Sequence, residues 1–256
     1  MRVSDPTKRF SSRVENYVRY RPGYPPEIVA LLHAQCGLTS SSVIADIGSG
    51  TGMLSRLFLE NGNRVFGVEP NQAMREAGEE LLAESENFTS ISGTAESTTL
   101  PAASVDFVTA AQAAHWFDRD KARQEFVRIL APRGWTALIW NDRRTDSTPF
   151  LREYENLLLT YSIDYREVQH RNMSETIDRF FAPARFQQSV LEMRQEFDYA
   201  GLEGRLLSSS YAPLSGHPNH APMMAELRRI FDKYQVNRRV VMEYDTQVFY
   251  SQMNPD

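Results

Sequence analysis

The sequence predicts an α/β fold in which a mostly parallel sheet carries helices on both faces. Short apolar runs alternate with amphipathic helical patterns from about residue 25 to residue 141. A glycine-rich turn follows the first apolar run and opens a helix. Strands that alternate with helices at this spacing pair in parallel, because each helix returns the chain across the sheet. The architecture expected is therefore doubly wound.

The first part of the chain supplies five strands and their connecting helices. The first helix begins near Pro25 and Pro26 and ends before Gly37, as helix start and stop signals predict. Further helices are expected at 53–61, 71–85 and 117–134, with Asn71 as an N-cap. The strands are expected at 43–47, 64–70, 88–92, 105–111 and 135–140.

Beyond residue 141 the alternation changes to longer helices and two β-rich segments. Helices are expected at 147–165, 174–183, 199–209 and 221–234, and strands at 186–197 and 239–253. We therefore divide the chain into three parts. Residues 1–141 form the core with an N-terminal arm, 142–183 a helical insertion over the top of the sheet, and 184–256 the last helices and two antiparallel edge strands that complete the sheet.

Composition excludes several classes of function. A net charge of −5 argues against a dedicated nucleic-acid binder, which needs clustered Lys and Arg. Cys36 is the only cysteine, so an intrachain disulfide is impossible and a structural zinc site of the usual kind is not expected. No apolar run approaches the length of a membrane span or a signal peptide. We expect a cytoplasmic protein without a metal or a membrane partner, either monomeric or homodimeric.

The stretch DIGSGTG, Asp46 to Gly52, lies where open α/β sheets bind ligands, at the carboxyl end of the first strand. It lacks both the spacing of a phosphate-binding fingerprint and the lysine of a P-loop. An anionic Asp46 beside the turn discourages a pyrophosphate but suits a ligand that carries an ammonium and a sulfonium. Glu69, at the end of the second strand, is placed to accept hydrogen bonds from a ribose. These features point to S-adenosylmethionine (SAM).

Three longer stretches resemble a known family. Residues 43–78, VIADIGSGTGMLSRLFLENGNRVFGVEPNQAMREAG, resemble the first two motifs of class I SAM-dependent methyltransferases of the small-molecule, type 11-like group. Residues 93–108, GTAESTTLPAASVDFV, resemble the third motif. The arm at 10–25 and AHWFD at 114–118 resemble the subgroup that includes trans-aconitate methyltransferases. The resemblance implies a Rossmann-like, seven-stranded sheet with a helical insertion after strand 5.

The resemblance also assigns contacts with the cofactor. The glycine turn would approach the methionine moiety and ribose, the third motif would face the adenine, and the arm would close over the cofactor. Thr94 stands where many relatives have Asp, which leaves the adenine amino contact to the backbone or to Glu96. Arg21 pairs with the cofactor carboxylate or forms only a structural salt bridge. The residues implied are Tyr17, Arg21, Asp46, Gly48, Ser49, Gly50, Gly52, Glu69, Pro70, Met74, Ala95, Glu96 and Gln112.

His115 is the candidate catalytic residue. Methyl transfer from a sulfonium is an in-line displacement that needs alignment and desolvation, and a base only when the nucleophile is protonated. His115 follows the fourth strand, where donor and acceptor should meet. It is a general base, a residue that contacts or orients the acceptor, or a packing histidine that shapes the loop, and the sequence leaves these three interpretations open.

The acceptor pocket is expected between residues 112–116, the strand end at 140–144 and the inserted helices. Two interpretations are open for Arg143 and Arg144: they recognise an anionic acceptor, or they are simply solvated. Two are also open for Tyr154, which either lines the pocket or packs in the insertion. The residues proposed to bind the acceptor are His115, Trp116, Trp140, Arg143, Arg144 and Tyr154.

The hypothesis that follows is a SAM-dependent methyltransferase that acts on a small organic molecule, either a carboxylate or a hydroxyl compound, and releases S-adenosylhomocysteine. Two other functions remain open. One is a SAM-binding module without turnover. The other, disfavoured by the spacing of the glycines, is a nicotinamide-dependent oxidoreductase.

Overall fold

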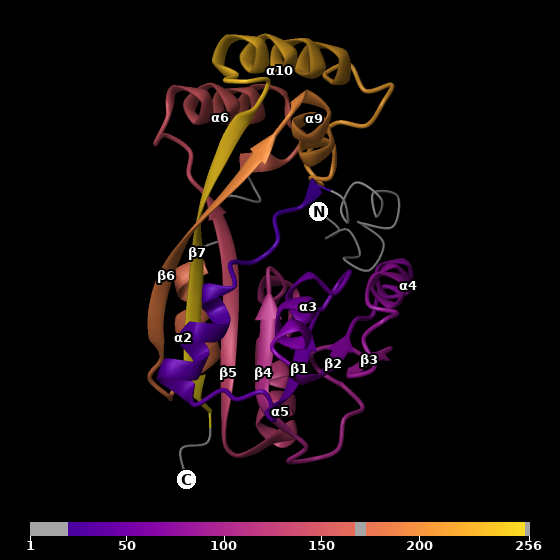
Figure 1. Cartoon of the computed structure of the whole chain (residues 1–256), viewed down its shortest axis with the longest axis vertical. Helices are drawn as coiled ribbons and strands as arrows, with labels where there is room; N and C mark the ends of the chain where they lie inside the picture. The colour runs from indigo at the N-terminus through magenta and orange to yellow at the C-terminus, as the bar shows by residue number, and fades with distance from the viewer. Residues whose placement is uncertain (1–19, 167–172, 254–256) are drawn as a thin grey trace.

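The computed structural model describes residues 20–166 and 173–253, which form an α/β core and a helical cap above it (Figure 1). The strands are β1 (Val43–Ile47), β2 (Arg64–Val68), β3 (Phe88–Ile91), β4 (Val105–Ala111), β5 (Leu130–Arg143), β6 (Gln187–Phe197) and β7 (Val240–Gln252). The helices are α2 (Glu27–Cys36), α3 (Met53–Glu60), α4 (Gln72–Leu81), η2 (Ala114–Trp116), α5 (Arg119–Ile129), α6 (Pro149–Tyr161), α8 (Met173–Phe181), α9 (Tyr199–Leu207) and α10 (His220–Tyr234).

The strands form one seven-stranded sheet in the order β3-β2-β1-β4-β5-β7-β6. The first five strands pair in parallel, whereas β7 is antiparallel to both β5 and β6. The predicted α/β class and the predicted number of strands are confirmed. The expectation of two antiparallel edge strands is half right, because β7 is inserted between β5 and β6 and only β6 lies at the edge.

The two faces of the sheet follow the alternation of side chains along the strands. On one face, Ile44 and Phe107 pack with side chains of α2 and α3 in one hydrophobic cluster. On the other face, the neighbouring residues Ala45 and Val108 pack with α5 and α8 in a second cluster. The sheet is therefore buried on both faces, as the near-continuous apolar runs of β1 and β4 predict.

The strands β6 and β7 extend beyond the core and reach the cap (Figure 1). Their far ends contribute Phe197, Met242 and Tyr244 to a third cluster, which also contains the buried side chains of α6, α9 and α10. The cap is thus built from two parts of the chain, 149–161 and 197–244, that the sequence had assigned to different units.

The structure also divides the predicted insertion, 142–183, differently. Its first helix, α6, belongs to the cap, but the second helix, α8, places Ile177, Phe180 and Phe181 in the core cluster beside Phe126 of α5. The Phe126 and Phe180 rings are 5.5 Å apart. The insertion is therefore not one unit over the top of the sheet.

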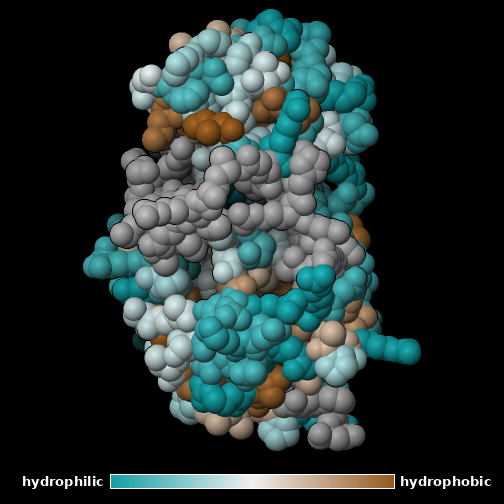
Figure 2. All heavy atoms as spheres, turned by 180° about the vertical axis from the view of Figure 1, so that it is seen from behind, coloured by the Kyte–Doolittle hydropathy of each residue, from teal (hydrophilic) through white to brown (hydrophobic). Residues whose placement is uncertain are grey.

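Apolar side chains are scattered over the surface. In the view from behind, both the core and the cap are mostly hydrophilic, with apolar side chains in small separate groups (Figure 2). Within the described residues, no helix is long and apolar enough to cross a membrane. The same residues contain no group of three or more His, Cys, Asp or Glu side chains that could hold a metal ion.

Candidate functional site

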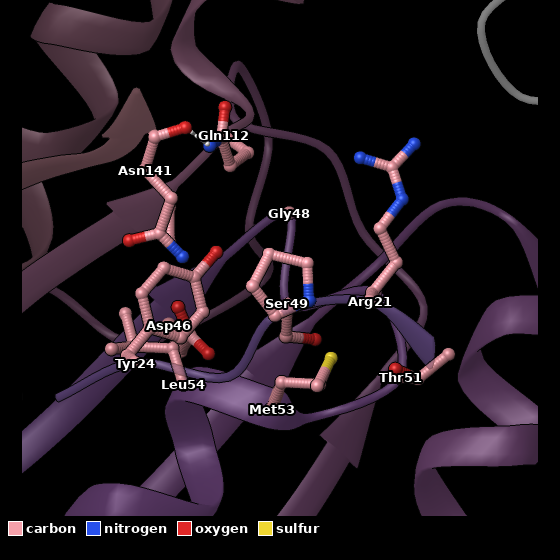
Figure 3. Close-up of a pocket in the computed structure, with 13 residues that line it drawn as sticks. Arg21, Tyr24, Asp46, Gly48, Ser49, Thr51, Met53, Leu54, Gln112 and Asn141 are labelled. Atoms are coloured by element: carbon pink, nitrogen blue, oxygen red, sulfur yellow. Dashed lines mark hydrogen bonds between the residues drawn. The ribbon is translucent and has the colours of Figure 1, made fainter. Parts of the chain in front are cut away.

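A pocket opens at the carboxyl ends of β1, β4 and β5 (Figure 3). This is the edge of an open α/β sheet at which ligands bind. The residues that line it are Arg21, Pro22, Tyr24, Asp46, Gly48, Ser49, Gly50, Thr51, Met53, Leu54, Ala111, Gln112 and Asn141. Six of the predicted cofactor contacts are in this set: Arg21, Asp46, Gly48, Ser49, Gly50 and Gln112.

The turn after β1 requires glycine. Gly48 and Gly50 have φ angles of 69° and 57°, in the left-handed region that favours this residue. A Cβ added at Gly48 would lie 2.6 Å from the Cβ of Ala113, so a side chain would collide with the loop after β4. The turn is held against the sheet because the Gly48 and Ser49 amides both donate to the carbonyl of Val68. Its backbone can therefore form one wall of the pocket.

Asp46 lies at the floor of the pocket with its carboxylate held on both sides. The Ser55 hydroxyl donates to Oδ2 at 2.6 Å, and the Thr109 hydroxyl donates to Oδ1 at 3.2 Å. Burial raises the pKa of Asp46 to about 6, although both hydroxyls favour the charged form. The site thus holds a carboxylate whose charge is poorly solvated and would be stabilised by a cationic ligand.

Glu69 follows β2 and braces the glycine turn. Its Oε2 accepts from the Gly50 amide at 3.0 Å, and its Oε1 accepts from the Asn71 amide at 2.8 Å. Burial raises the pKa of Glu69, and the two amides oppose this shift. The position beside the turn agrees with the predicted ribose contact. Next to it, Met74 is buried in α4, whereas Pro70 is exposed.

The third-motif loop packs against the start of α5. Ala95 is buried, and the Glu96 carboxylate accepts from the Asp118 amide at 2.8 Å. Asp118 also caps α5 by accepting from the Lys121 amide. Glu96 therefore fixes the loop after β3 to the loop after β4, a role that the sequence does not predict.

Gln112 and Asn141 meet at the opposite wall of the pocket (Figure 3). The Gln112 side chain donates to the Asn141 carbonyl at 3.1 Å, and Gln112 has a φ of 55°, unusual for this residue type. Asn141, which the sequence analysis missed, donates to the Gly23 carbonyl at 2.8 Å and accepts from the Thr246 hydroxyl at 2.7 Å. The feature of the sequence that could have indicated this role is its position, because Asn141 is a polar residue at the end of a predicted strand.

The segment before α2 runs between the pocket and the cap. Arg21 and Tyr24 line the pocket, and Arg21 donates to the carbonyl of Ser208 at the end of α9 at 3.2 Å. Tyr20 packs on α9 so closely that a Cβ at Gly204 would lie 2.2 Å from its ring. Tyr17, the other predicted arm contact, falls outside the described residues.

His115 and Trp116 form part of η2, the short helix that follows β4. Both are half-buried, and their rings lie 4.8 Å apart. Neither residue lines the pocket described above, although Gln112, three residues earlier, does. The three interpretations of His115 therefore stay open.

The chain is similar in sequence to known proteins. Residues 45–138 match the family model described as a methyltransferase domain. An uncharacterized methyltransferase from Mycobacterium tuberculosis is 37% identical over 139 residues, which cover 54% of this chain and 54% of that protein. The chain thus spans about half the length of the curated relatives it matches.

Solved structures share the fold. That of a candidate type II methyltransferase from Anaeromyxobacter dehalogenans has a TM-score of 0.72 at 24% identity and covers 93% of this chain and 100% of that chain. A second structure is that of a phosphoethanolamine N-methyltransferase from Haemonchus contortus, solved with phosphomonomethylethanolamine and S-adenosylhomocysteine. Its TM-score is 0.50 at 16% identity, and the match covers 94% of this chain and 56% of that chain. Residues 45–138 of the chain thus match a methyltransferase domain, and the chain shares the fold of solved methyltransferases. The resemblance to the trans-aconitate subgroup stays a prediction.

The residues expected on the acceptor side beyond β4 do not line the pocket at the glycine turn. Trp140 is only 3% exposed and packs in the core, with its ring 6.4 Å from that of Phe249. Arg144 is neither an anion site nor a freely solvated group, because it pairs with Asp245 at 2.6 Å and Glu192 at 2.8 Å.

Arg143 is likewise neutralised within the protein. Its guanidinium forms an ion pair with Glu155, donates to the Tyr165 hydroxyl at 3.0 Å and stacks over the ring of Tyr154. Tyr154 is 2% exposed, so it belongs to the interior of the cap. These residues form an internal polar cluster and do not line the pocket at the glycine turn.

Proposed function

We propose that the protein is an enzyme that transfers the methyl group of SAM to a small organic acceptor and releases S-adenosylhomocysteine. The observation that carries this proposal is the pocket in which the Asp46 carboxylate, the glycine turn and the strand-end residues Gln112 and Asn141 meet. The family match over residues 45–138 supports it. The presence of S-adenosylhomocysteine in the Haemonchus structure, which shares the fold, supports it as well.

The residues at the pocket fit this cofactor. Gly48 and Gly50 line the pocket without side chains, so the methionine part can approach the backbone of the turn closely. The buried carboxylate of Asp46 suits the ammonium group. Each oxygen of Glu69 accepts one amide and keeps a further lone pair for a ribose hydroxyl. Met74 lies near the turn for apolar contact with the adenine.

The chain itself has to align the reactants and exclude water. Bound SAM supplies a methyl group already activated on a sulfonium, so in-line displacement needs little further chemistry. Gln112 and Asn141 would orient the cofactor's methionine end, and Arg21 and Tyr24 would cover it. A closed pocket strengthens the attraction between Asp46 and a cationic ligand, because the effective dielectric constant is lower there.

We propose a carboxylate or a hydroxyl compound as the acceptor. A carboxylate is already ionised at neutral pH and requires no base. A hydroxyl acceptor would need a proton acceptor near the loop after β4, and His115 is the candidate for that role. A carboxylate acceptor needs no base, whereas a hydroxyl acceptor does. The identity of the acceptor therefore decides whether His115 is catalytic.

Calorimetric titration with SAM and with S-adenosylhomocysteine tests the cofactor assignment. Both should bind to the wild type with 1:1 stoichiometry, and Glu69→Ala should weaken both while an exposed control, Glu76→Ala, should not. No binding of either compound at millimolar concentration would refute the proposal.

The acceptor requires a separate search. SAM with a labelled methyl group, incubated with the protein and fractionated metabolites, should yield a labelled product and stoichiometric S-adenosylhomocysteine. Cofactor binding without any labelled product across the fractions would favour a binding module without turnover.

A further inference from the structure

A second polar cluster lies inside the cap, and its centre is Arg205 of α9. The side chain is buried, with 7% of the residue exposed. Its Nε donates to the Tyr244 hydroxyl at 3.4 Å, and its Nη1 donates to the Ser209 hydroxyl at 3.0 Å. Both partners are neutral groups, so these contacts orient the guanidinium without neutralising it.

No carboxylate among the described residues balances the charge of Arg205. Arg143, the other arginine of this cluster, pairs with the carboxylate of Glu155. Across residues 20–166 and 173–253, Arg205 forms no ion pair with any carboxylate. A buried charge without a counter-charge is costly, so a ligand that supplies the missing negative charge would be stabilised here.

Tyrosines surround this guanidinium. Tyr154, Tyr211 and Tyr244 lie close enough to Arg205 to influence its charge electrostatically. Burial raises the pKa of Tyr154 well above its ordinary value, and the nearby charges of Arg205 and Arg143 oppose the shift. The Tyr154 phenol is therefore neutral at pH 7, and its hydroxyl is able to donate a hydrogen bond to an anion.

Two donor atoms of the cluster, the Arg205 Nη2 and the Tyr154 hydroxyl, have no hydrogen-bond partner among the described residues. Some polar atoms in the described residues are fully buried and lack a hydrogen-bond partner. Neither of these two atoms is one of them. One donor of the guanidinium and one phenol in the interior of the cap can therefore bind a ligand that enters it.

The cluster is connected to the methyl-donor pocket through two consecutive residues of the cap. Arg21, which lines the pocket, donates to the carbonyl of Ser208. The next residue, Ser209, accepts from Arg205. An acceptor that reaches from the cap toward the pocket would therefore meet Arg205 at its far end.

We propose that Arg205, with Ser209 and Tyr154, binds an oxyanion group of the acceptor, a carboxylate or a phosphate, that is not the group methylated. This inference rests on the proposed function. A guanidinium that binds an oxyanion lowers its nucleophilicity, so the bound group anchors the acceptor while a different atom attacks the methyl group. The acceptor class is then a bifunctional molecule with an anionic end and a separate nucleophile. Arg205 is a specificity-determining residue.

The test uses protein saturated with S-adenosylhomocysteine and carrying ¹³C-labelled tyrosine rings. Glutarate and phenyl phosphate serve as probes for the two oxyanions, and the neutral glutaramide as the matched control. At least one anion should shift the Tyr154 signal saturably, and glutaramide should not. Arg205→Met should weaken anion binding at least tenfold, whereas Arg56→Met, an exposed arginine outside the cluster, should leave it unchanged.

Two further measurements separate the possible outcomes. S-adenosylhomocysteine should bind to Arg205→Met within twofold of wild type, and failure of wild type itself to bind it would count against the proposed function. The Tm of Arg205→Met should equal or exceed that of wild type, because a desolvated charge is removed. Equal anion binding by wild type and Arg205→Met, or none by wild type, would overturn the inference. Should Arg205→Met not fold, Arg205→Lys keeps the charge but not the forked donors and should bind the anion more weakly.

Discussion

The side-chain amide of Asn141 donates to the carbonyl of Gly23 at 2.8 Å, which ties the end of β5 to the segment before α2. The same side chain accepts from the Thr246 hydroxyl of β7 at 2.7 Å, and its carbonyl accepts from Gln112. One residue thus links the segment before α2, β7 and the loop after β4. The position of Tyr24 and Arg21 over the pocket depends on it.

We predict that Asn141→Ala weakens SAM binding about tenfold, because a hydrogen bond of this kind contributes on the order of 1 kcal/mol and its loss frees the covering segment. Calorimetry provides the measurement. Thr246→Val is the matched control, since it removes one partner of Asn141 and leaves the contact with Gly23 in place. Its affinity should fall less than that of Asn141→Ala. Equal affinity of wild type and Asn141→Ala would show that this contact does not hold the pocket closed.

The second prediction concerns the charge of Asp46 and stability. Since burial raises its pKa from 3.8 to about 6, the stabilising contribution of Asp46 is full below about pH 4 and is lost as the pH rises through about 6. A shift of this size corresponds to about 3 kcal/mol. Asp46→Asn should therefore match wild type near pH 4 and exceed its free energy of unfolding at pH 8, as urea denaturation would measure.

The same substitution should impair binding. SAM affinity of wild type should rise between pH 5 and pH 7 as Asp46 ionises, and the affinity of Asp46→Asn should be lower and nearly independent of pH. Ser55→Ala is the control variant, because it removes a hydrogen bond to Asp46 but keeps the carboxylate. If Asp46→Asn were no more stable than wild type at pH 8, the conclusion that the Asp46 charge is poorly solvated would be contradicted.

The sequence predicts those features of the fold and the site that depend on neighbours along the chain. The glycine turn at 48–52 has conformational requirements that only glycine satisfies, and β4 was predicted with its observed bounds, 105–111. Asp46 and Glu69 could be predicted as site residues because each lies at the end of a strand next to the turn. Such local determinants are visible in one sequence.

Features that depend on the order of strands in space could not be predicted. Asn141 contacts Thr246 only because β7 is inserted beside β5, and nothing near either residue indicates this pairing. Arg143 and Arg144 carry the same charge pattern whether they meet a ligand or an internal carboxylate, and the structure provides the carboxylates. Likewise, the apolar face of α8 would fit either the cap or the core.

The third prediction addresses His115, on the short helix after β4. If it contacts or deprotonates the acceptor, His115→Ala should lower turnover at least tenfold while SAM affinity changes less than twofold, because the residue does not line the pocket at the glycine turn. Steady-state kinetics with the identified acceptor, combined with calorimetry, would measure both. His33→Ala, on the exposed side of α2, is the control. Unchanged turnover would leave a packing role.

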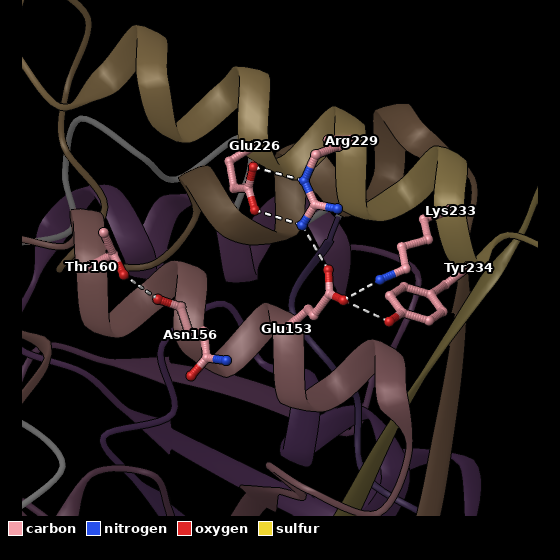
Figure 4. A network of polar contacts seen from close by, with 7 residues as sticks. All are labelled: Glu153, Asn156, Thr160, Glu226, Arg229, Lys233 and Tyr234. Carbon is pink, nitrogen blue, oxygen red and sulfur yellow. Dashed lines mark hydrogen bonds and ion pairs between the residues drawn. The ribbon is translucent and has the colours of Figure 1, made fainter.

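The fourth prediction concerns the ion-pair network that joins α6 to α10 in the cap (Figure 4). Glu153 accepts from Lys233 at 2.5 Å, from the Tyr234 hydroxyl at 2.6 Å and from Arg229 at 2.7 Å. Lys233 and its neighbours lower the pKa of Glu153 to about 2. The network's contribution is therefore present above about pH 4.5 and is lost as the pH falls toward 2.

Because the basic partners are about half exposed, solvent screens the network, and Glu153→Gln should reduce stability by only about 1 kcal/mol at pH 7. Differential scanning calorimetry should show a Tm lower by about 2–4 °C. The difference from wild type should shrink in 0.5 M salt and near pH 2. Glu60→Gln, which breaks an isolated exposed pair with Arg56, should change the Tm less. A difference that persists undiminished at low pH would show that Glu153 acts through packing of the two helices and not through its charge.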